Sequence, residues 1–514
     1  MIYRSYKKNL RCFIIVAMLA AALSSASFAT QTTKHLAIGV DFRQDINTDS
    51  TCALVTNVIT VDTDNRNAKL KAALAGDFVC EEGLSKGREA VSALTGRKGA
   101  LLGVNADYFP FTGDPLGVCI VDGELVSEPY GSRVAMAVSK NGMVTFDKPR
   151  QSASLTLTGG ASRQIDGINR GRETNQVVLY TETFAASTQT KYKGTEIVLK
   201  SDDLPVRVGK DIKFTVVDVK ADAINTPIPK GGAVLSAGGP AAWFLKQNLK
   251  PGDSLNIRFD IKSDICYDWT QVDQAVGGGP WLVKDGKESV DFADEGFSVS
   301  FACARHPRTA AGLTSDNKLL LVTVDGRQSI SGGLSLNELA SLMKRLGAVN
   351  AINLDGGGST TLSIKGIVIN SPSGGAQRQV ADALLIFADQ TPAAELAKLA
   401  ISGIGSEIAV GEGAQLYLTW GDDSQMLTQE QLQRVVWGIT NGIGFVNQQG
   451  YFTPTRSGRG TITAFYGSQR ISLGVTVISK KPETPVNPDL IPAEPSAPAS
   501  SAGSELAEPE LGTN

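Results

Sequence analysis

Two aspartates that follow apolar runs are the first residues of this chain whose type and position suit catalysis. Asp325 comes directly after the run 319–324, and Asp355 comes directly after the run 349–354. A carboxyl group at such a position can activate water or attack a sugar carbon, as paired carboxylates do in glycoside hydrolysis. We therefore consider both aspartates as catalytic candidates and favour Asp355.

The segment after Asp355 has the composition of a ligand-binding loop. It reads Gly356-Gly357-Gly358-Ser359-Thr360. Three glycines let backbone amides approach a ligand closely, and the two hydroxyls add hydrogen-bond donors. A flexible connection is the alternative, but a glycine triplet fixed between two apolar runs favours ligand binding.

Arginines near these motifs indicate an anionic ligand. Arg308 and Thr309 lie in the run 305–312 beside Pro307, and Arg327 follows Asp325 and Gly326. A guanidinium group is planar and permanently charged, so it suits the oxygens of a phosphate. On this evidence alone a surface pair of Arg305 and Arg308 is equally consistent, and a lone Arg378 before the last apolar strand indicates little.

Two further segments have the residue types of a sugar pocket. Asn105 and Asp107 are two residues apart, so on an extended chain they point the same way and could orient sugar hydroxyls or supply an acid or base. An Asx-stabilised turn explains them equally well. The segment Gly277-Gly278-Gly279-Pro280 before Trp281 could line a pocket with backbone, or form a tight bend.

Composition excludes several classes of function. The chain has only two histidines, His35 and His306, which makes clusters of histidine ligands and two-histidine phosphate chemistry improbable. No cofactor and no metal centre are expected, since the cysteine spacing also fits no zinc pattern. The net charge of −3, without a basic block, gives no electrostatic support for a nucleic-acid partner.

Local patterns predict the elements that hold the candidates. Ser335 and Glu338 form a capping-box pattern, and leucines at helical spacing continue to Gly347. This helix lies between the apolar strands 319–324 and 349–354, which predicts a strand–helix–strand unit. If the two strands are parallel, Asp325 and Asp355 stand at one edge of the sheet. Tight hairpins are predicted at 122–123, 141–142 and 285–286.

The amino terminus predicts export. Basic residues 4–11, an apolar run 12–23 and small residues before Ala29 are typical of a signal peptide over 1–29. We expect a secreted or cell-envelope protein with no transmembrane segment in the mature chain. In an oxidising compartment, Cys52 with Cys80 and Cys266 with Cys303 are candidate disulfides, and Cys119 is expected to be a buried free thiol.

The carboxyl-terminal part changes character. Alternating strands around Trp437 over 395–479 predict a small all-β sandwich, and this segment resembles bacterial Ig-like domains. Such a module could attach the protein to the cell envelope. Residues 480–514 are rich in Pro, Ala, Ser and Glu, which is typical of a disordered tail.

Taken together, the motifs over about 50–388 resemble the phosphodiester glycosidase family. The motifs are 105–109, 277–280, 306–310, 324–327, the loop 353–360 and Arg378. The resemblance implies a catalytic domain over 30–390 that hydrolyses a sugar-1-phosphodiester, such as a GlcNAc-1-phosphodiester in an envelope or extracellular phosphoglycan. Asp355, Asp325, Asp107 and Arg308 are then the catalytic candidates, while Arg327, Arg378, Asn105 and the glycine loop bind substrate.

Two other functions stay open from the sequence. A phosphodiesterase would use the same arginines but break the P–O bond, and a non-catalytic protein would only bind an envelope glycan. The expected fold class is α+β, with a β-rich mixed-sheet catalytic domain containing the strand–helix–strand unit, followed by the Ig-like sandwich.

Overall fold

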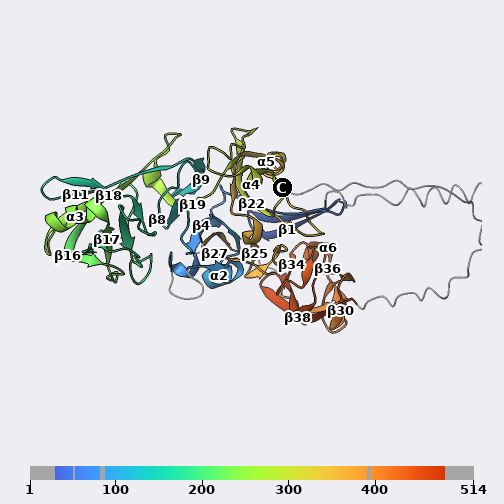
Figure 1. Cartoon of the computed structure of the whole chain (residues 1–514). Helices are drawn as coiled ribbons and strands as arrows, with labels where there is room; N and C mark the ends of the chain where they lie inside the picture. Colours follow the sequence, from blue (N-terminus) through green and yellow to red (C-terminus); the bar gives the residue numbers. More distant parts are fainter. Residues whose placement is uncertain (1–28, 50–52, 81–86, 111, 390–394, 481–514) are drawn as a thin grey trace, which may run out of the picture.

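The computed structural model describes residues 29–49, 53–80, 87–110, 112–389 and 395–480. Across these residues the chain is mostly β, with 38 strands and five short α-helices (Figure 1). The helices are α2 (Val91–Lys98), α3 (Gly239–Asn248), α4 (Val299–Cys303), α5 (Leu336–Arg345) and α6 (Gln429–Leu432). The expected α+β class is therefore wrong, because sheets rather than a helical layer cover most of the apolar surface.

The candidate aspartates follow strands of one eight-stranded sheet. In spatial order its strands are β1 (Ala29–Ala37), β2 (Val40–Asn47), β3 (Leu54–Asp62), β23 (Lys318–Val324), β22 (Arg308–Thr314), β24 (Ala348–Leu354), β20 (Trp281–Lys284) and β21 (Lys287–Glu288). Every pairing in it is antiparallel, so the expected mixed sheet is wrong here.

The predicted strand–helix–strand unit is corrected by the position of β22. This strand lies between β23 and β24 and is antiparallel to each. β23 and β24 therefore run in the same direction without being neighbours, and they form no parallel pair. The strand β22 forms a hairpin with β23, and only its long-range pairing with β24, which no local pattern shows, separates β23 from β24.

Helix α5 itself agrees with its sequence pattern. Ser335 Oγ accepts from the Glu338 amide at 3.3 Å, and the Ser335 amide donates to Glu338 Oε2 at 2.8 Å. Leu336, Leu339 and Met343 are buried against the eight-stranded sheet. Because three to four residues separate these side chains, one face of the helix is apolar along its length.

Two five-stranded sheets complete the core around the site. One contains β26 (Ile367–Val368), β25 (Leu362–Ile364), β6 (Leu102–Asn105), β28 (Asp382–Ala388) and β4 (Ala68–Leu74). The other contains β10 (Val144–Asp147), β9 (Ala135–Ser139), β19 (Val272–Gly277), β7 (Cys119–Val121) and β8 (Glu124–Ser127). A two-stranded ribbon pairs β5 (Glu89–Ala90) with β27 (Gln379–Val380). Phe42, Val104, Val276 and Ile352 belong to the shared hydrophobic core.

The three predicted hairpins are confirmed by these sheets. Asp122-Gly123 joins β7 to β8, Asn141-Gly142 joins β9 to β10, and Asp285-Gly286 joins β20 to β21. Asp122 and Gly123 have φ of 49° and 79°, which is the left-handed pair that a two-residue hairpin requires.

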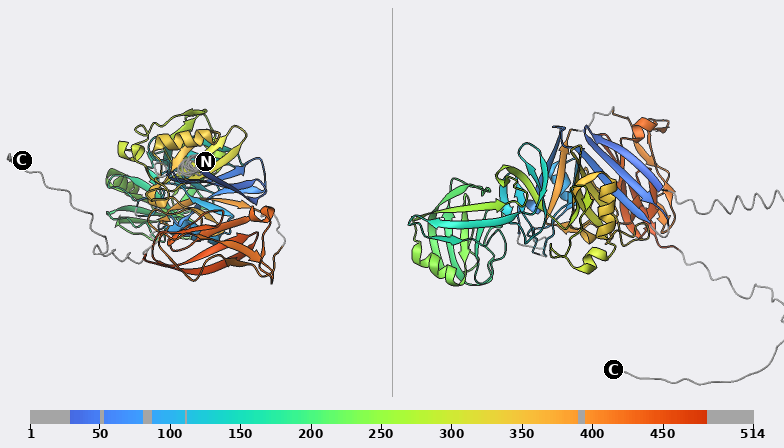
Figure 2. Two further views of the ribbon diagram at one scale, coloured as in Figure 1. Left: turned by 90° about the vertical axis from the view of Figure 1, so that its right-hand side faces the viewer. Right: turned by 90° about the horizontal axis from the view of Figure 1, so that it is seen from above.

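A separate lobe lies between β10 and β19 in the chain, and the sequence did not predict it. Its strands are β12 (Ser162–Gln164), β11 (Arg150–Leu157), β18 (Ser254–Lys262), β16 (Asp211–Ala223), β15 (Gly194–Lys200), β17 (Gly232–Ala237), β14 (Val177–Thr181) and β13 (Gly167–Ile168). Helix α3 packs on this sheet, and the lobe projects at one end of the molecule (Figures 1 and 2). Most of one hydrophobic cluster, including Phe214 and Ile257, lies inside it.

Residues 400–478 form a module at the other end (Figure 2). Its first sheet contains β29 (Ala400–Ser402), β32 (Tyr417–Trp420) and β33 (Gln425–Met426). Its second sheet contains β30 (Glu407–Ala409), β38 (Gln469–Ile478), β37 (Gly458–Tyr466) and β34 (Val435–Ile439). Its third sheet contains β31 (Ala414–Gln415), β36 (Tyr451–Pro454) and β35 (Gly444–Val446). Trp437 and Phe452 lie in its own core. The Ig-like assignment stays a prediction.

The cysteines do not form the predicted Cys266–Cys303 bridge. Both residues are exposed free thiols, and Cys119 is a buried free thiol as expected. Cys52 lies outside the described residues, so its pairing with Cys80 stays a prediction, as do the signal peptide and the tail. Among the helices of the described ranges, none has the length and apolarity needed to cross a membrane.

Candidate active site

Strand β22 sets the spacing of the site. Arg308 lies opposite Val324 of β23, and Thr309 lies opposite Leu354 of β24. Asp325 and Asp355 are the next residues after those partners, so they leave the sheet on either side of Arg308. Strands two positions apart in a sheet are separated by about 10 Å, and this sets the separation of the two backbones. The expected placement of both aspartates at one sheet edge is thus observed.

The glycine loop lies against all three predicted arginines. A methyl group at Gly356 would be 2.8 Å from the Pro307 carbonyl oxygen, next to Arg308. At Gly357, whose φ is 59°, it would be 3.3 Å from Arg327 Nη2. At Gly358 it would be 2.5 Å from Arg378 Nη2. A side chain at Gly358 would only displace the flexible end of Arg378, so the need for glycine comes from the positive φ of Gly357 and from the Pro307 main-chain oxygen that faces Gly356.

Arg308 is a buried and fixed charge. Its side chain donates to the carbonyl oxygens of Leu334 at 2.9 Å, Phe301 at 2.8 Å and Ala304 at 3.0 Å. Its guanidinium also lies 4.9 Å from the centre of the Phe301 ring. Burial lowers the pKa of Arg308 to about 10, so the group keeps its charge at neutral pH.

Arg327 and Arg378 are exposed and lie over the glycine loop. Arg327 Nη2 is 3.2 Å from His306 Nδ1, and Arg378 Nη1 donates to Ser359 Oγ at 3.3 Å. Burial and the two nearby arginine charges lower the pKa of His306, which keeps its ring neutral and able to accept from Arg327. Within the described parts of the chain, no ion pair includes Arg308, Arg327 or Arg378.

Asp355 is held at the entrance of the loop. Its carboxyl accepts from the Gly356 amide at 2.9 Å, and Asn105 Nδ2 donates to its main-chain oxygen at 2.6 Å. Burial raises the pKa of Asp355 to about 6, while the Ser359 hydrogen bond and the Arg378 charge act in the opposite direction. The residue is partly exposed and therefore accessible to a ligand. Because its pKa is about 6, the carboxyl is ionised at neutral pH.

Asp325 is buried and fully engaged. Its two carboxyl oxygens accept from Asn370 Nδ2 and from the Ser371 amide, each at 2.9 Å. The same Asn370 amide group donates to the Thr360 main-chain oxygen at 3.1 Å, so it joins Asp325 to the end of the glycine loop. Burial raises the pKa of Asp325 to about 7. These contacts suit a residue that fixes the loop rather than one that meets substrate.

Asp107 also faces the protein interior. Its carboxyl accepts from the amides of Tyr108 and Gly117, each at 2.7 Å, and its own amide donates to Asp382 Oδ1 at 2.8 Å. Asp382 is wholly buried, and its Oδ2 has no hydrogen-bond partner in the described residues. Burial raises the pKa of both carboxyls, and the charge of Asp107 further raises the pKa of Asp382.

The remaining predicted residues form the frame of the site. Asn105 Oδ1 accepts from Thr309 Oγ1 at 2.8 Å and from the Thr361 amide at 3.0 Å. The Gly279 amide donates to the Asn353 main-chain oxygen at 2.7 Å, and Gly278 packs against the same oxygen. Gly326 has no room for a side chain, because a methyl group there would be 2.6 Å from the Pro307 nitrogen. Thr360 is buried in the loop.

The sequence missed five residues of this network, namely Tyr108, Asn353, His306, Asn370 and Asp382. Tyr108 donates its hydroxyl to the Gly279 oxygen at 2.7 Å and accepts from Asn353 Nδ2 at 2.6 Å. His306, Asn370 and Asp382 hold Arg327, Asp325 and Asp107 in the ways described above. Tyr108, Asn353 and His306 lie inside the quoted motifs, so their positions were a usable signal. For Asn370 and Asp382 no local pattern was available.

Comparison with known proteins assigns this region to a class. Residues 210–387 match the family model of phosphodiester glycosidases, so this part of the chain is similar to that family. The match includes the glycine loop and the three arginines, whereas Asn105 and Asp107 precede it. This range begins inside the projecting lobe, well after the residue 50 at which the sequence resemblance begins.

Individual relatives agree with the class over short stretches. A prophage-derived uncharacterized protein of Bacillus subtilis is 40% identical over 108 residues, covering 21% of this chain and 16% of that protein. The N-acetylglucosamine-1-phosphodiester alpha-N-acetylglucosaminidase of Mus musculus is 34% identical over 109 residues, covering 20% of this chain and 21% of that enzyme. The chain thus spans about a fifth or less of these relatives.

A solved structure matches over a longer range. A protein of Burkholderia pseudomallei described as exported has a TM-score of 0.54 and 27% identity, covering 65% of this chain and 74% of that one. The similarity extends beyond the family match, so the fold around the site is shared with a bacterial protein.

Proposed function

We propose that this chain hydrolyses the sugar–phosphate linkage of a sugar-1-phosphodiester and releases a free sugar and a phosphomonoester. The observation that carries the proposal is the meeting of Arg308, Arg327 and Arg378 at a glycine loop that begins with Asp355. In the part of the chain that the structure describes these three arginines form no ion pair, and cations next to backbone amides favour an anionic ligand. The family match supports the reaction class.

In this proposal Arg327 and Arg378 hold the phosphate oxygens. A phosphodiester carries one negative charge, and a departing phosphomonoester gains a second. Two exposed guanidinium groups and the buried charge of Arg308 stabilise that gain, which makes electrostatic stabilisation the main contribution to catalysis. Because a phosphomonoester leaves readily, no strong acid is needed on the bridging oxygen.

Asp355 acts as the base toward water. The water oxygen bonds to the anomeric carbon, Asp355 takes one water proton, and the bond from that carbon to the bridging oxygen breaks. The electron pair of the broken bond leaves on the phosphate. A pKa of about 6 suits this role, because the carboxylate is ionised at neutral pH and is still basic enough to accept a proton.

Asp325 and Asp107 then act as positioning residues. Asp325 fixes the end of the glycine loop through Asn370, and Asp107 fixes the turn after β6 through two amides. We assign the sequence-predicted catalytic role to Asp355 alone among the three carboxyls. Arg308, a catalytic candidate from the sequence, acts in this proposal as a fixed charge next to the loop.

We also infer that the protein is exported and acts on an envelope or extracellular phosphoglycan. The signal-peptide pattern of residues 1–29 supports export. The similar Burkholderia protein is also described as exported. Attachment to the envelope through residues 395–479 is part of the same inference.

Hydrolysis in heavy-oxygen water tests the reaction. The substrate is N-acetylglucosamine-1-phosphate esterified to methanol, and both products are analysed by mass spectrometry. Label in the free sugar and none in the phosphate is the expected result. Label in the phosphate would mean that the P–O bond breaks, so the protein would be a phosphodiesterase. Binding of the ester without any product would leave only a glycan-binding role.

A further inference from the structure

A groove lies between the carboxyl-terminal module and the loop that supports Asp325. Its volume is about 640 Å³. One wall is the segment 366–377, which contains Asn370 and Ser371, and the other wall comes from 439–444, Thr455 and Arg456 of the module. Asn370 and Ser371 are the two residues that hold the Asp325 carboxyl, so the groove and the candidate active site share a wall.

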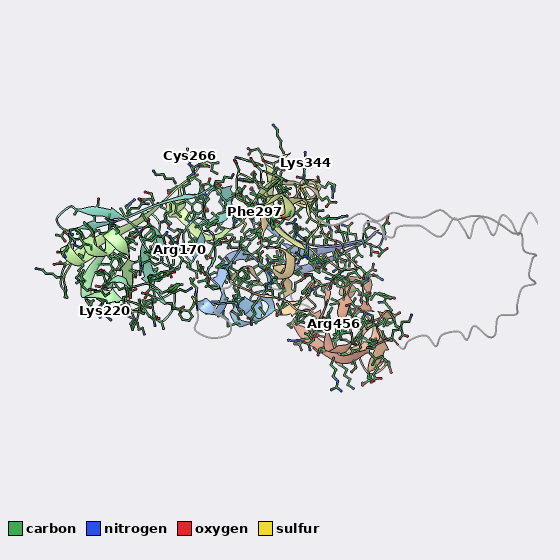
Figure 3. The ribbon with its side chains drawn as sticks, in the orientation of Figure 1. Arg170, Lys220, Cys266, Phe297, Lys344 and Arg456 are labelled. Atoms are coloured by element: carbon green, nitrogen blue, oxygen red, sulfur yellow. The ribbon has the colours of Figure 1, made fainter. Side chains whose placement is uncertain are left out.

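The module is fixed against this wall by direct contacts. Arg456, labelled in Figure 3, donates through Nη2 to the main-chain oxygens of Gly375 at 3.2 Å and Asn441 at 3.1 Å. Elsewhere the Gln448 amide donates to Gln44 Oε1 at 2.9 Å, and both side chains are buried. The groove is therefore a feature of the folded chain and not a gap between unconnected domains.

The groove begins beside the phosphate-holding arginines. Gln328, which follows Arg327, and Gln377, which precedes Arg378, both line it. Gln328 is anchored by a reciprocal pair of hydrogen bonds to Ser371, at 2.6 Å and 2.8 Å. Because Gln328 and Gln377 adjoin the two arginines along the chain, a phosphate held by Arg327 and Arg378 would lie at the end of this groove.

The lining matches a neutral saccharide. Gln328, Asn441, Ser329, Ser373 and Thr455 offer amides and hydroxyls, and Ile367 and Ile439 offer apolar surface. The hydroxyls of Ser329 and Ser373 make no hydrogen bond to the described residues. Sugar rings have polar edges and apolar faces, and they are bound by convergent polar groups with some apolar contact. Arg456 is the single charged side chain in the lining.

We propose that this groove binds the saccharide on the leaving side of the phosphodiester, so that the substrate is an extended phosphoglycan. The proposal rests on the function proposed above, and it gives the carboxyl-terminal module a share in substrate binding. In the bound substrate, the sugar that will be released lies at Asp355. The glycan that will leave with the phosphate lies in the groove.

The test compares two substrates that differ only in the leaving group. Each is N-acetylglucosamine-1-phosphate, esterified either to methanol or to the 6-hydroxyl of maltotriose. We expect the wild-type kcat/KM for the maltotriose ester to exceed that for the methyl ester by about tenfold, as expected from two ordinary hydrogen bonds. Ser329→Trp fills the groove from the catalytic side, and Thr455→Trp fills it from the module side.

Both groove variants should bring the ratio of the two kcat/KM values close to one. Ser402→Trp is the matched control, because Ser402 is exposed in the same module and does not line the groove. Its ratio should remain that of the wild type. A wild-type ratio near one, or groove variants with the wild-type ratio, would overturn the proposal. Circular dichroism checks that each variant is folded.

A binding measurement separates this proposal from the proposed function. If the wild type cleaves neither ester, the proposed hydrolase function is wrong. Saturation-transfer NMR then tests saccharide binding in the groove independently of activity. Signals from the maltotriose unit should appear with the wild type and with Ser402→Trp, and should be lost with Ser329→Trp and Thr455→Trp. Equal signals from all four proteins would reject the groove whatever the activity.

Discussion

Replacing Asp355 by Asn should remove most of the activity without unfolding the protein. The Asn side chain has nearly the same shape and can still accept the Gly356 amide, which is 2.9 Å from the carboxyl in the native chain. It cannot take a proton from water. Loss of a general base costs about 10²–10⁴-fold in rate, so we expect a loss of about 10³-fold in kcat, or about 4 kcal/mol in the barrier.

The pH dependence gives an independent check on the same residue. A base works only when it is unprotonated, and burial raises the pKa of Asp355 to about 6. The wild-type kcat/KM should therefore rise with pH up to about 6 and level off above it. In Asp355→Asn the small residual rate should lack this rise.

The assay measures release of N-acetylglucosamine from the methyl phosphodiester between pH 4 and 8. Asp202→Asn is the control, because Asp202 is exposed in the projecting lobe and makes the same change of charge. A rate for Asp355→Asn within threefold of the wild type would refute the assignment. If kcat/KM of Asp355→Asn still rose with pH as it does in the wild type, the titrating group would be a residue other than Asp355.

Three further predictions follow from the contacts of the site. Arg308→Ala should destabilise the protein by about 3 kcal/mol in urea unfolding, because one buried and two partly buried carbonyls lose their charged donor; an unchanged midpoint would contradict this. Arg378→Gln should raise KM at least tenfold, and Arg378→Lys should raise KM less because it keeps the positive charge. Equal KM values for the wild type and both variants would exclude a contact between Arg378 and the phosphate. Asn370→Ala should lower stability by about 2 kcal/mol and kcat severalfold, since Asp325 and Thr360 lose a shared donor; retention of both would show that this link is dispensable.

Local sequence signals determined much of the site itself. The capping box at Ser335 and the two-residue hairpins depend on contacts within a few residues, so their patterns are sufficient to predict them. The glycine triplet after Asp355 was likewise evident from residue type, whereas the arginines at 308, 327 and 378 became a set only through the family resemblance. These are the residues that meet in the folded chain.

Their roles were decided by tertiary structure. Nothing near Asp325 in the sequence shows that Asn370 and Ser371 occupy both of its carboxyl oxygens, or that Asp382 contacts Asp107. The sequence favoured Asp355 but kept Asp325 and Asp107 as catalytic candidates, because all three are carboxyls in motifs of the same kind. Differences in burial and in hydrogen-bond partners, which come from distant segments, separate them.

The fold class and the lobe were also beyond the sequence pattern. An apolar strand–helix–strand segment indicates its own elements but not its neighbours, and β22 enters between β23 and β24 from an earlier part of the chain. Cys266 and Cys303 met the chemical requirement for a disulfide, yet both remain free and exposed in the folded chain. The sequence by itself therefore determined which groups are available, because residue type and local period are local properties. Only the long-range pairing of strands decided which of those groups face a ligand, since that pairing depends on contacts across the whole chain.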